Sequence, residues 1–374
     1  MRASLRAVFY RVLPTLLVCI GLLEVGLRLS GRRPSNTTEG IFAPHGSAYR
    51  LRRNLDKVSR TPSFTTTIIT NDMGFRDRAP GKRELGAVPY IAWVGDSITF
   101  ANGVDYDQSF VGVFDELAAQ RGVESANLAV GGHRFSDEEE TLYEFLEAVP
   151  VKPTWVIIVF TAMGITTFEQ RYDDIMVKDG YLFPTKRWWI PYVTVTLGNT
   201  SSAYCFFRDG VRGVQARLRS GNPKSGLEIL GDLFAKRGPW GRAEVPARFE
   251  ARLAHLDERI RHFKAEPIYV YLPSGVDLRA KEFLALPGHD PADYDFEIFL
   301  RLLQHHAERA GVHVVNLLPL LQAHHDAGER LTFALDPHYD VAANRIIGMA
   351  LRDTLLGEAG LLAPATMTAS RGHP

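Results

Sequence analysis

The chain has little cysteine and no net charge, and each absence excludes a class of protein. Only Cys19 and Cys205 occur in 374 residues, so a disulfide framework cannot hold the fold together. The 43 lysines and arginines are matched by 43 aspartates and glutamates, which leaves no electrostatic footprint for nucleic acid. We therefore expect no nucleic-acid partner.

Spacings typical of metal ligands are also missing. Histidines occur as the adjacent pairs His305-His306 and His324-His325, and neighbouring side chains point in different directions on a helix. A shared metal at either pair is therefore not expected. The sequence implies no metal and no organic cofactor.

An apolar run near the N-terminus is long enough to cross a bilayer. It extends over residues 12–29 and is preceded by Arg2, Arg6 and Arg11. No small-residue cleavage site of the Ala-x-Ala kind follows, so residues 1–30 predict an uncleaved membrane anchor rather than a removed signal peptide. We expect a single pass through the inner membrane, with the remaining chain outside the cytoplasm. The alternative is an amphipathic helix docked on the protein.

The rest of the chain divides by composition and periodicity. Residues 31–89 read as a linker and a β-rich lead-in, and residues 358–374 as a flexible tail. Between them, residues 90–357 alternate between short apolar runs and helical patterns, which predicts a parallel sheet with helices on both faces. The expected strands are 90–94, 126–130, 155–160, 268–272 and 312–317. The expected helices are 110–120, 136–148 (capped by Ser136), 244–263, 294–310 and 341–355.

An aromatic-rich insertion at about residues 161–243 interrupts this alternation. It contains two adjacent tryptophans, Trp188 and Trp189, among many tyrosines and phenylalanines. One interpretation is a lid or an acceptor-binding surface, and such a surface could face the membrane. The other is an inserted hairpin and helix with a small core of its own.

A Gly-Asp-Ser triplet at residues 95–97 follows the expected strand 90–94 directly. In open α/β sheets, ligands bind at the carboxyl ends of the strands. Ser97 is therefore a candidate nucleophile, although a serine here also serves as the cap of a helix. Taken alone, the triplet does not decide between these roles.

Two further segments lie in matching places. Gly131 and Gly132 end the expected strand 126–130, where a glycine lets the backbone N–H approach a ligand; the alternative is a flexible turn. Asp336 and His338 precede the last expected helix. A nucleophilic serine needs a base and an acid that orients the base, although a histidine there is also compatible with a polar surface.

With these residues the chain resembles the SGNH (GDSL) hydrolase superfamily. Residues 95–97 match the first block, Gly132 the second, and Asp336 with His338 the last. Residues 24–28 and 71–76 resemble the membrane-anchored bacterial branch, and the resemblance covers residues 20–357. It implies a flavodoxin-like α/β/α sandwich with a central parallel sheet, in which Ser97 is the nucleophile, His338 the base and Asp336 its orienting acid.

Two departures from the family pattern matter. Met163 stands where the family has an oxyanion-hole asparagine, and Thr161 replaces the glycine before it; Thr161, Thr166 or Asn102 would have to supply a substitute donor. Losing one oxyanion donor costs about 10²–10³ in rate, against about 10⁶ for the nucleophile, so a weakened enzyme is expected. The acid–base spacing is Asp-x-His rather than Asp-x-x-His, which leaves Asp340 as a second candidate orienter.

The resemblance implies a serine esterase or O-acyltransferase that acts on O-acyl esters, O-acetyl esters foremost, of envelope glycan or lipid through an acyl-enzyme. Its expected partners are that acylated glycan or lipid and the membrane. The alternative from another class is a non-catalytic, glycan-binding domain of an envelope assembly. A phospholipase is the third, and it predicts an apolar slot lined from residues 172–207.

Overall fold

The computed structural model describes residues 10, 12–32, 34, 40–46, 48–61, 63–82, 84–170, 174–219, 231–334, 336–357 and 360–362. The chain forms two compact units. The helical unit comprises Met1–Gly40, Ser59–Pro62 and Asp174–Pro223, and the sheet unit comprises Ile41–Val58, Ser63–Asp173 and Lys224–Pro374.

The sheet unit is built on five strands in the order β11-β10-β7-β5-β6, and every neighbouring pair is parallel. The strands are β5 (Tyr90–Val94), β6 (Glu124–Asn127), β7 (Trp155–Phe160), β10 (Glu266–Tyr271) and β11 (His313–Asn316). Numbered along the chain, this is the order 2-1-3-4-5, whose switch point lies between β5 and β7. The expected α/β class with a central parallel sheet is confirmed.

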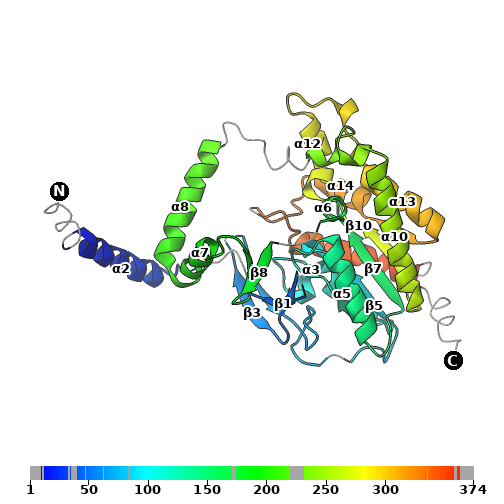
Figure 1. Cartoon of the computed structure of the whole chain (residues 1–374), viewed down its shortest axis with the longest axis horizontal. Helices are drawn as coiled ribbons and strands as arrows, with labels where there is room; N and C mark the ends of the chain where they lie inside the picture. The colour runs from blue at the N-terminus through cyan, green and yellow to red at the C-terminus, as the bar shows by residue number, and fades with distance from the viewer. Residues whose placement is uncertain are drawn as a thin grey trace. The chain divides into compact units, whose positions relative to one another are not determined.

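Helices cover both faces of this sheet (Figure 1), because its strands are apolar on both sides. In β5, Tyr90, Ala92 and Val94 face one core, whereas Ile91 and Trp93 face the other. Helices α5 (Phe135–Ala148), α10 (Glu244–His262) and α13 (Ile298–Ala310) pack on the first core. Helices α4 (Phe110–Ala119), α14 (Leu318–Asp326) and α15 (Val341–Leu356) pack on the second.

Shorter elements lie outside the five-stranded sheet. Two pairs of strands form the lead-in: β1 (Phe42–His45) with β2 (Ala48–Leu51), and β3 (Asp56–Arg60) with β4 (Thr65–Ile69). The short helices are α3 (Ser97–Phe100), α6 (Ala162–Thr166), α11 (Gly275–Leu278) and α12 (Ala280–Leu284), and the 3₁₀ turns are η2 (Tyr106–Gln108), η3 (Asp232–Phe234), η4 (Pro239–Gly241) and η5 (Pro291–Asp293).

Some expected boundaries were wrong for local reasons. Strand β6 ends at Asn127 because this side chain turns the chain, accepting a hydrogen bond from the N–H of Ala129 at 3.1 Å. Ser136 does not cap α5: the helix starts at Phe135, and the Ser136 hydroxyl donates to the carbonyl of Phe168 instead. Helix α13 starts at Ile298 rather than at residue 294.

The helical unit contains α2 (Leu13–Leu29), the hairpin of β8 (Ile175–Lys178) and β9 (Tyr181–Pro184), and helices α7 (Trp189–Thr200) and α8 (Ser202–Arg219). The Glu24 carboxylate of α2 accepts hydrogen bonds from the backbone N–H groups of Ser202 and Ala203 at the start of α8. Arg28 donates to the carbonyl of Thr200, the last residue of α7. These bonds tie α2 to the corner between α7 and α8.

The expected membrane anchor includes α2. No helix within the described ranges combines the length and the apolar character that crossing a bilayer requires. Arg2, Arg6 and Arg11 lie outside those ranges, as does most of the expected tail. Of that tail, residues 360–362 are described, and Leu362 packs into the second core.

Candidate active site

Ser97 is the first residue of α3, the short helix that follows β5. Asp96 caps this helix, and its Oδ1 accepts a hydrogen bond from the N–H of Ile98 at 2.8 Å. Gly95 is required before it, because a Cβ there would lie 2.2 Å from Oγ1 of Thr99. The sharp turn places Ser97 at the carboxyl edge of the sheet, beside the switch point between β5 and β7.

Two hydrogen bonds connect Ser97 with His338 and Asp336. Nε2 of His338 lies 2.8 Å from Oγ of Ser97, and Nδ1 lies 2.5 Å from Oδ1 of Asp336. The backbone N–H of His338 donates to the same carboxylate oxygen at 3.0 Å. The side chains of His338 and Asp336 are 18% and 24% exposed, so solvent reaches them. The structure thus brings together an alcohol, an imidazole and a carboxylate from two segments that are 241 residues apart in the sequence.

The loop that carries His338 is fixed by the two residues that follow the histidine. Tyr339 is buried, and its hydroxyl donates to the carbonyl of Pro273. Asp340 caps α15, where Oδ1 accepts a hydrogen bond from the N–H of Ala343 at 3.0 Å. The Asp340 carboxylate therefore serves the helix, and the carboxylate beside the imidazole is that of Asp336.

The two aspartates near Ser97 have opposite pKa shifts. Burial alone would raise the pKa of Asp336, but the hydrogen bonds from the ring and the backbone of His338 outweigh it and lower that pKa below its ordinary value. Burial raises the pKa of Asp96, and its hydrogen bonds from Ile98 and Thr161 compensate only in part. Asp336 is thus the carboxylate held in its ionised form beside the imidazole.

Thr161 links the ends of β7 and β5. Its hydroxyl donates to Oδ2 of Asp96 at 3.2 Å and accepts from the N–H of Gly164 at 3.0 Å, which caps α6. To donate to a substrate oxygen, this hydroxyl would have to leave Asp96. The role of Thr161 as an oxyanion donor stays a prediction.

Gly132 has the left-handed backbone that glycine adopts most easily, with φ of +84°. A Cβ there would lie 2.8 Å from the hydroxyl oxygen of Tyr49. Within the described ranges, the backbone N–H groups of Gly132 and Ser97 donate to no acceptor. Their role as oxyanion donors stays a prediction.

Met163 lies in α6 and its side chain, which is 43% exposed, carries no N–H donor. Of the other substitutes, Thr166 uses its hydroxyl to donate to the carbonyl of Met163 at 2.9 Å. The Asn102 amide lies nearer the reacting groups, with Nδ2 at 3.5 Å from Nδ1 of His338.

Arg76, which the analysis of the sequence did not identify as a site residue, holds the loop after Ser97. The guanidinium is buried and donates to the carbonyls of Phe100, Ala101 and Val104. Phe100 is the last residue of α3, and the other two carbonyls follow it; Ala101, the C-cap, has a φ of +58°. Helix ends leave carbonyls without partners, and here Arg76 satisfies them and fixes the turn that presents Ser97.

Asn127 and Asn71 support the same loop. The Asn127 side chain donates to the carbonyl of Thr99 at 3.1 Å. The Asn71 side chain accepts from the N–H groups of Met73 and Phe75, which shapes the turn that leads to Arg76. In the sequence, residues 71–76 stood out only by their resemblance to a family. Nothing in this segment alone predicts that Arg76 binds the carbonyls after α3.

No protein-family model matches the chain, and no curated protein matches it. Solved structures similar to it include TesA, at 17% identity over 71% of this chain and 97% of that chain, with a TM-score of 0.39. AlinE4, an SGNH-hydrolase family esterase, has 13% identity over 66% and 86%, with a TM-score of 0.34. A catalytic mutant of Axe2, an acetylxylan esterase from Geobacillus stearothermophilus, has 14% identity over 72% and 95%, with a TM-score of 0.40. At these TM-scores, the similarities by themselves do not establish what this chain does.

The Arg76 bonds predict a large effect of one substitution. Arg76→Gln keeps a single amide donor, so buried carbonyls after α3 lose their partners and the free energy of unfolding should fall by about 3 kcal/mol. The control is Arg78→Gln, because Arg78 is 42% exposed, donates to one carbonyl, that of Gly112, and pairs with Asp115 at 3.4 Å, for which we expect a loss of about 1 kcal/mol. Urea unfolding measures both, and equal losses would contradict the assigned role of Arg76.

The lowered pKa of Asp336 predicts a pH-dependent contribution to stability. Because the folded-state pKa lies below that of the unfolded chain, about 3.9, the carboxylate stabilises the fold above that value, and this stabilisation is lost as the pH falls through the folded-state pKa. The stability difference between wild type and Asp336→Asn should therefore shrink from neutral pH to the lowest pH at which the wild type stays folded. In the control Asp340→Asn, asparagine caps a helix as well as aspartate does, so little change is expected at neutral pH. A difference that grows in acid would refute the assigned shift.

Proposed function

We propose that this chain is a serine esterase of the SGNH type, acting on O-acyl esters, O-acetyl esters foremost, of envelope glycan or lipid. The observation that carries the proposal is the hydrogen-bonded series Ser97–His338–Asp336 at the switch point of the sheet. The 2-1-3-4-5 strand order supports the finer assignment to a flavodoxin-like α/β/α sandwich. The motif resemblance at Ser97, Gly132 and His338 supports the family.

The first half of the reaction forms an acyl-enzyme. The Ser97 Oγ attacks the ester carbonyl while Nε2 of His338 takes its proton, and Asp336 stabilises the imidazolium. The tetrahedral intermediate then collapses: the bond to the leaving oxygen breaks, and His338 returns the proton to that oxygen. The free N–H groups of Ser97 and Gly132 are the donors for the oxyanion.

The second half releases the acyl group. His338 takes a proton from a water molecule or a sugar hydroxyl as its oxygen attacks the acyl carbonyl. The bond between the acyl carbon and the Ser97 Oγ then breaks, and His338 returns the proton to that Oγ. Water gives hydrolysis and a sugar hydroxyl gives acyl transfer, and both use the same residues. We place the enzyme at the inner membrane, held through residues 1–30, with the sheet unit outside the cytoplasm. This part of the proposal rests on the sequence of residues 12–29 and on the resemblance at residues 24–28, since no described helix meets the requirements for crossing a bilayer.

Covalent labelling tests the nucleophile. A fluorophosphonate probe should label the wild-type chain at Ser97 and fail to label Ser97→Ala, because the probe requires an activated serine. His338→Ala should label far more slowly, since the base is gone. Fluorescence after gel electrophoresis measures both, and equal labelling of wild type and Ser97→Ala would sink the proposal.

The second candidate is a non-catalytic domain that binds glycan, and Met163 favours it because methionine provides no oxyanion donor. The loss of one donor leaves most of the rate enhancement in place, so we expect measurable turnover of a small acetyl ester. His338→Ala should reduce that turnover by about 10⁴-fold or more, whereas binding of an acetylated polysaccharide survives.

The control for this experiment is His305→Ala, since His305 is an exposed histidine of α13 paired with Glu250. It should leave turnover unchanged. If the wild type and His338→Ala bind glycan equally and neither hydrolyses the acetyl ester, the chain is a non-catalytic glycan-binding domain instead.

A further inference from the structure

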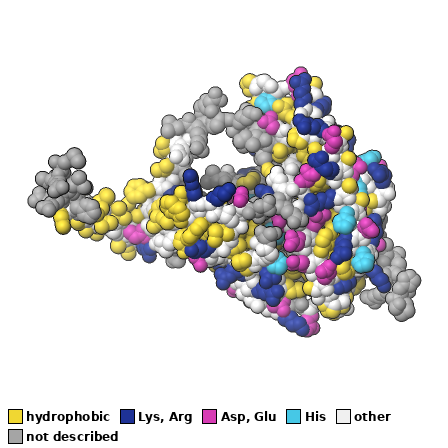
Figure 2. Space-filling model, viewed as in Figure 1, with side chains coloured by type: hydrophobic (Ala, Val, Ile, Leu, Met, Phe, Trp, Pro, Cys, Tyr) yellow, Lys and Arg dark blue, Asp and Glu magenta, His cyan; other side chains and the backbone are white. Residues whose placement is uncertain are grey.

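Helix α7 exposes an apolar surface and carries no charge. None of its twelve residues is a lysine, arginine, aspartate or glutamate. Its exposed apolar side chains are 39% to 59% accessible: Trp189, Ile190, Val193 and Leu197. Figure 2 shows hydrophobic side chains gathered over this part of the helical unit and along α2. A surface of this kind needs a covering partner.

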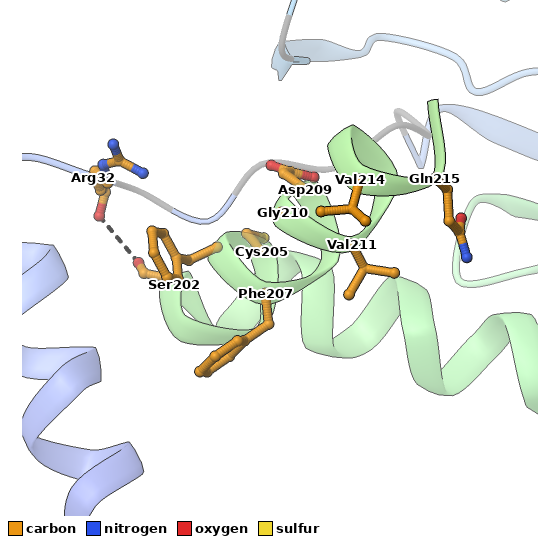
Figure 3. Close-up of a pocket in the computed structure, with 10 residues that line it drawn as sticks. Arg32, Ser202, Cys205, Phe207, Asp209, Gly210, Val211, Val214 and Gln215 are labelled. Atoms are coloured by element: carbon orange, nitrogen blue, oxygen red, sulfur yellow. Dashed lines mark hydrogen bonds between the residues drawn. The ribbon is translucent and has the colours of Figure 1, made fainter. Parts of the chain in front are cut away.

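Helix α8 continues the apolar surface. Phe206, Phe207, Val211 and Val214 are each 44% to 55% exposed. They line a cavity of about 810 Å³ together with Arg32. Figure 3 shows Phe207, Val211 and Val214 along α8, with the hydrogen bond from the Ser202 hydroxyl to the carbonyl of Arg32. The cavity is within the size range of pockets that hold small organic groups.

Positive charge accompanies the apolar side chains. Residues 174–219 contain seven lysines and arginines but three aspartates, whereas the whole chain is balanced. Lys186 and Arg187 are exposed and directly precede the Trp188-Trp189 pair. Nζ of Lys178 lies 3.9 Å from the ring centroid of Trp188. Basic and aromatic residues beside an apolar face are typical of helices that lie at a bilayer surface.

Helix α2 belongs to the same surface. Its exposed apolar side chains include Leu17, Val18 and Leu22, at 61% to 69%. The bonds of Glu24 and Arg28 to the α7–α8 corner hold α2 against these helices. The apolar faces of α2, α7 and α8 thus belong to one body.

We propose that the helical unit docks on an anionic lipid bilayer through the exposed face of α7 and α8, with Trp188 and Trp189 at the headgroup level. This goes beyond the esterase proposal and does not depend on it. It adds a second membrane contact to that expected of residues 1–30. Charge complementarity selects the occupant, because anionic headgroups match Lys186 and Arg187, whereas a second copy would bring the same positive charge.

Tryptophan quenching in the full chain tests the proposal. The other tryptophans, Trp93, Trp155 and Trp240, are buried in the sheet unit. With vesicles of phosphatidylglycerol and phosphatidylcholine, lipids that carry a quencher near the headgroup should quench the Trp188 and Trp189 emission more than lipids quenched near the bilayer centre. Replacing both by phenylalanine should remove the quenchable fraction.

The matched variants are Val193→Asp with Leu197→Asp on α7, and Val341→Asp with Met349→Asp on α15. The first pair is 49% and 39% exposed and the second 44% and 40%, so neither disturbs a core. The α7 pair should abolish quenching without lowering the melting temperature, and the α15 pair should leave quenching unchanged. Emission from Trp188 and Trp189 that lipid quenchers do not change overturns the proposal, as does a dimer that shields them in the presence of vesicles.

Discussion

The parallel pairing of β5 with β7 is the constraint on which the candidate site depends. In the register, Val94 lies opposite Ile158, so both strands end at the same edge of the sheet and deliver Asp96 and Thr161 to it. The hydroxyl of Thr161 joins these ends through Oδ2 of Asp96. The loop with His338 precedes α15. This helix packs on α4, and both helices lie on the core that contains Ile91 and Trp93 of β5. Sheet pairing therefore assembles Ser97 and His338 from segments 241 residues apart.

Two aspartates lie near Ser97 at this edge of the sheet, and they differ in pKa and in role. Asp96 is half-buried, and the desolvation of its carboxylate raises its pKa; its oxygens serve the local turn. Asp336 receives two donors from His338 and has a lowered pKa. A carboxylate that stays ionised orients an imidazole and stabilises its charged form, whereas a protonated one would not. The difference supports Asp336, and not Asp96, as the acid of the proposed series.

The sequence was a good guide where the determinant is local. Strands β5 and β7 were predicted at their observed bounds because an unbroken apolar run with turn residues on both sides leaves little choice. The start of α5 was not, because the N–H of Arg134 donates to the Asp137 carboxylate and frees Ser136 for a bond to a distant carbonyl. The role of Arg76 could not be predicted for the same reason, because its partners are carbonyls that come near it only in the folded chain.

Glu24 and Arg28 change how the two membrane-related features of the sequence are understood. In the sequence, they are charges near the end of an apolar run, at the position where long side chains reach lipid headgroups. In the fold, Glu24 binds the first N–H groups of α8, where the helix dipole favours a negative charge, and Arg28 binds the last carbonyl of α7. The apolar helix and the aromatic insertion are therefore parts of one unit. Whatever covers the exposed apolar side chains of α2 must also fit those of α7 and α8, which have a positive charge beside them, and a bilayer with anionic headgroups meets both conditions.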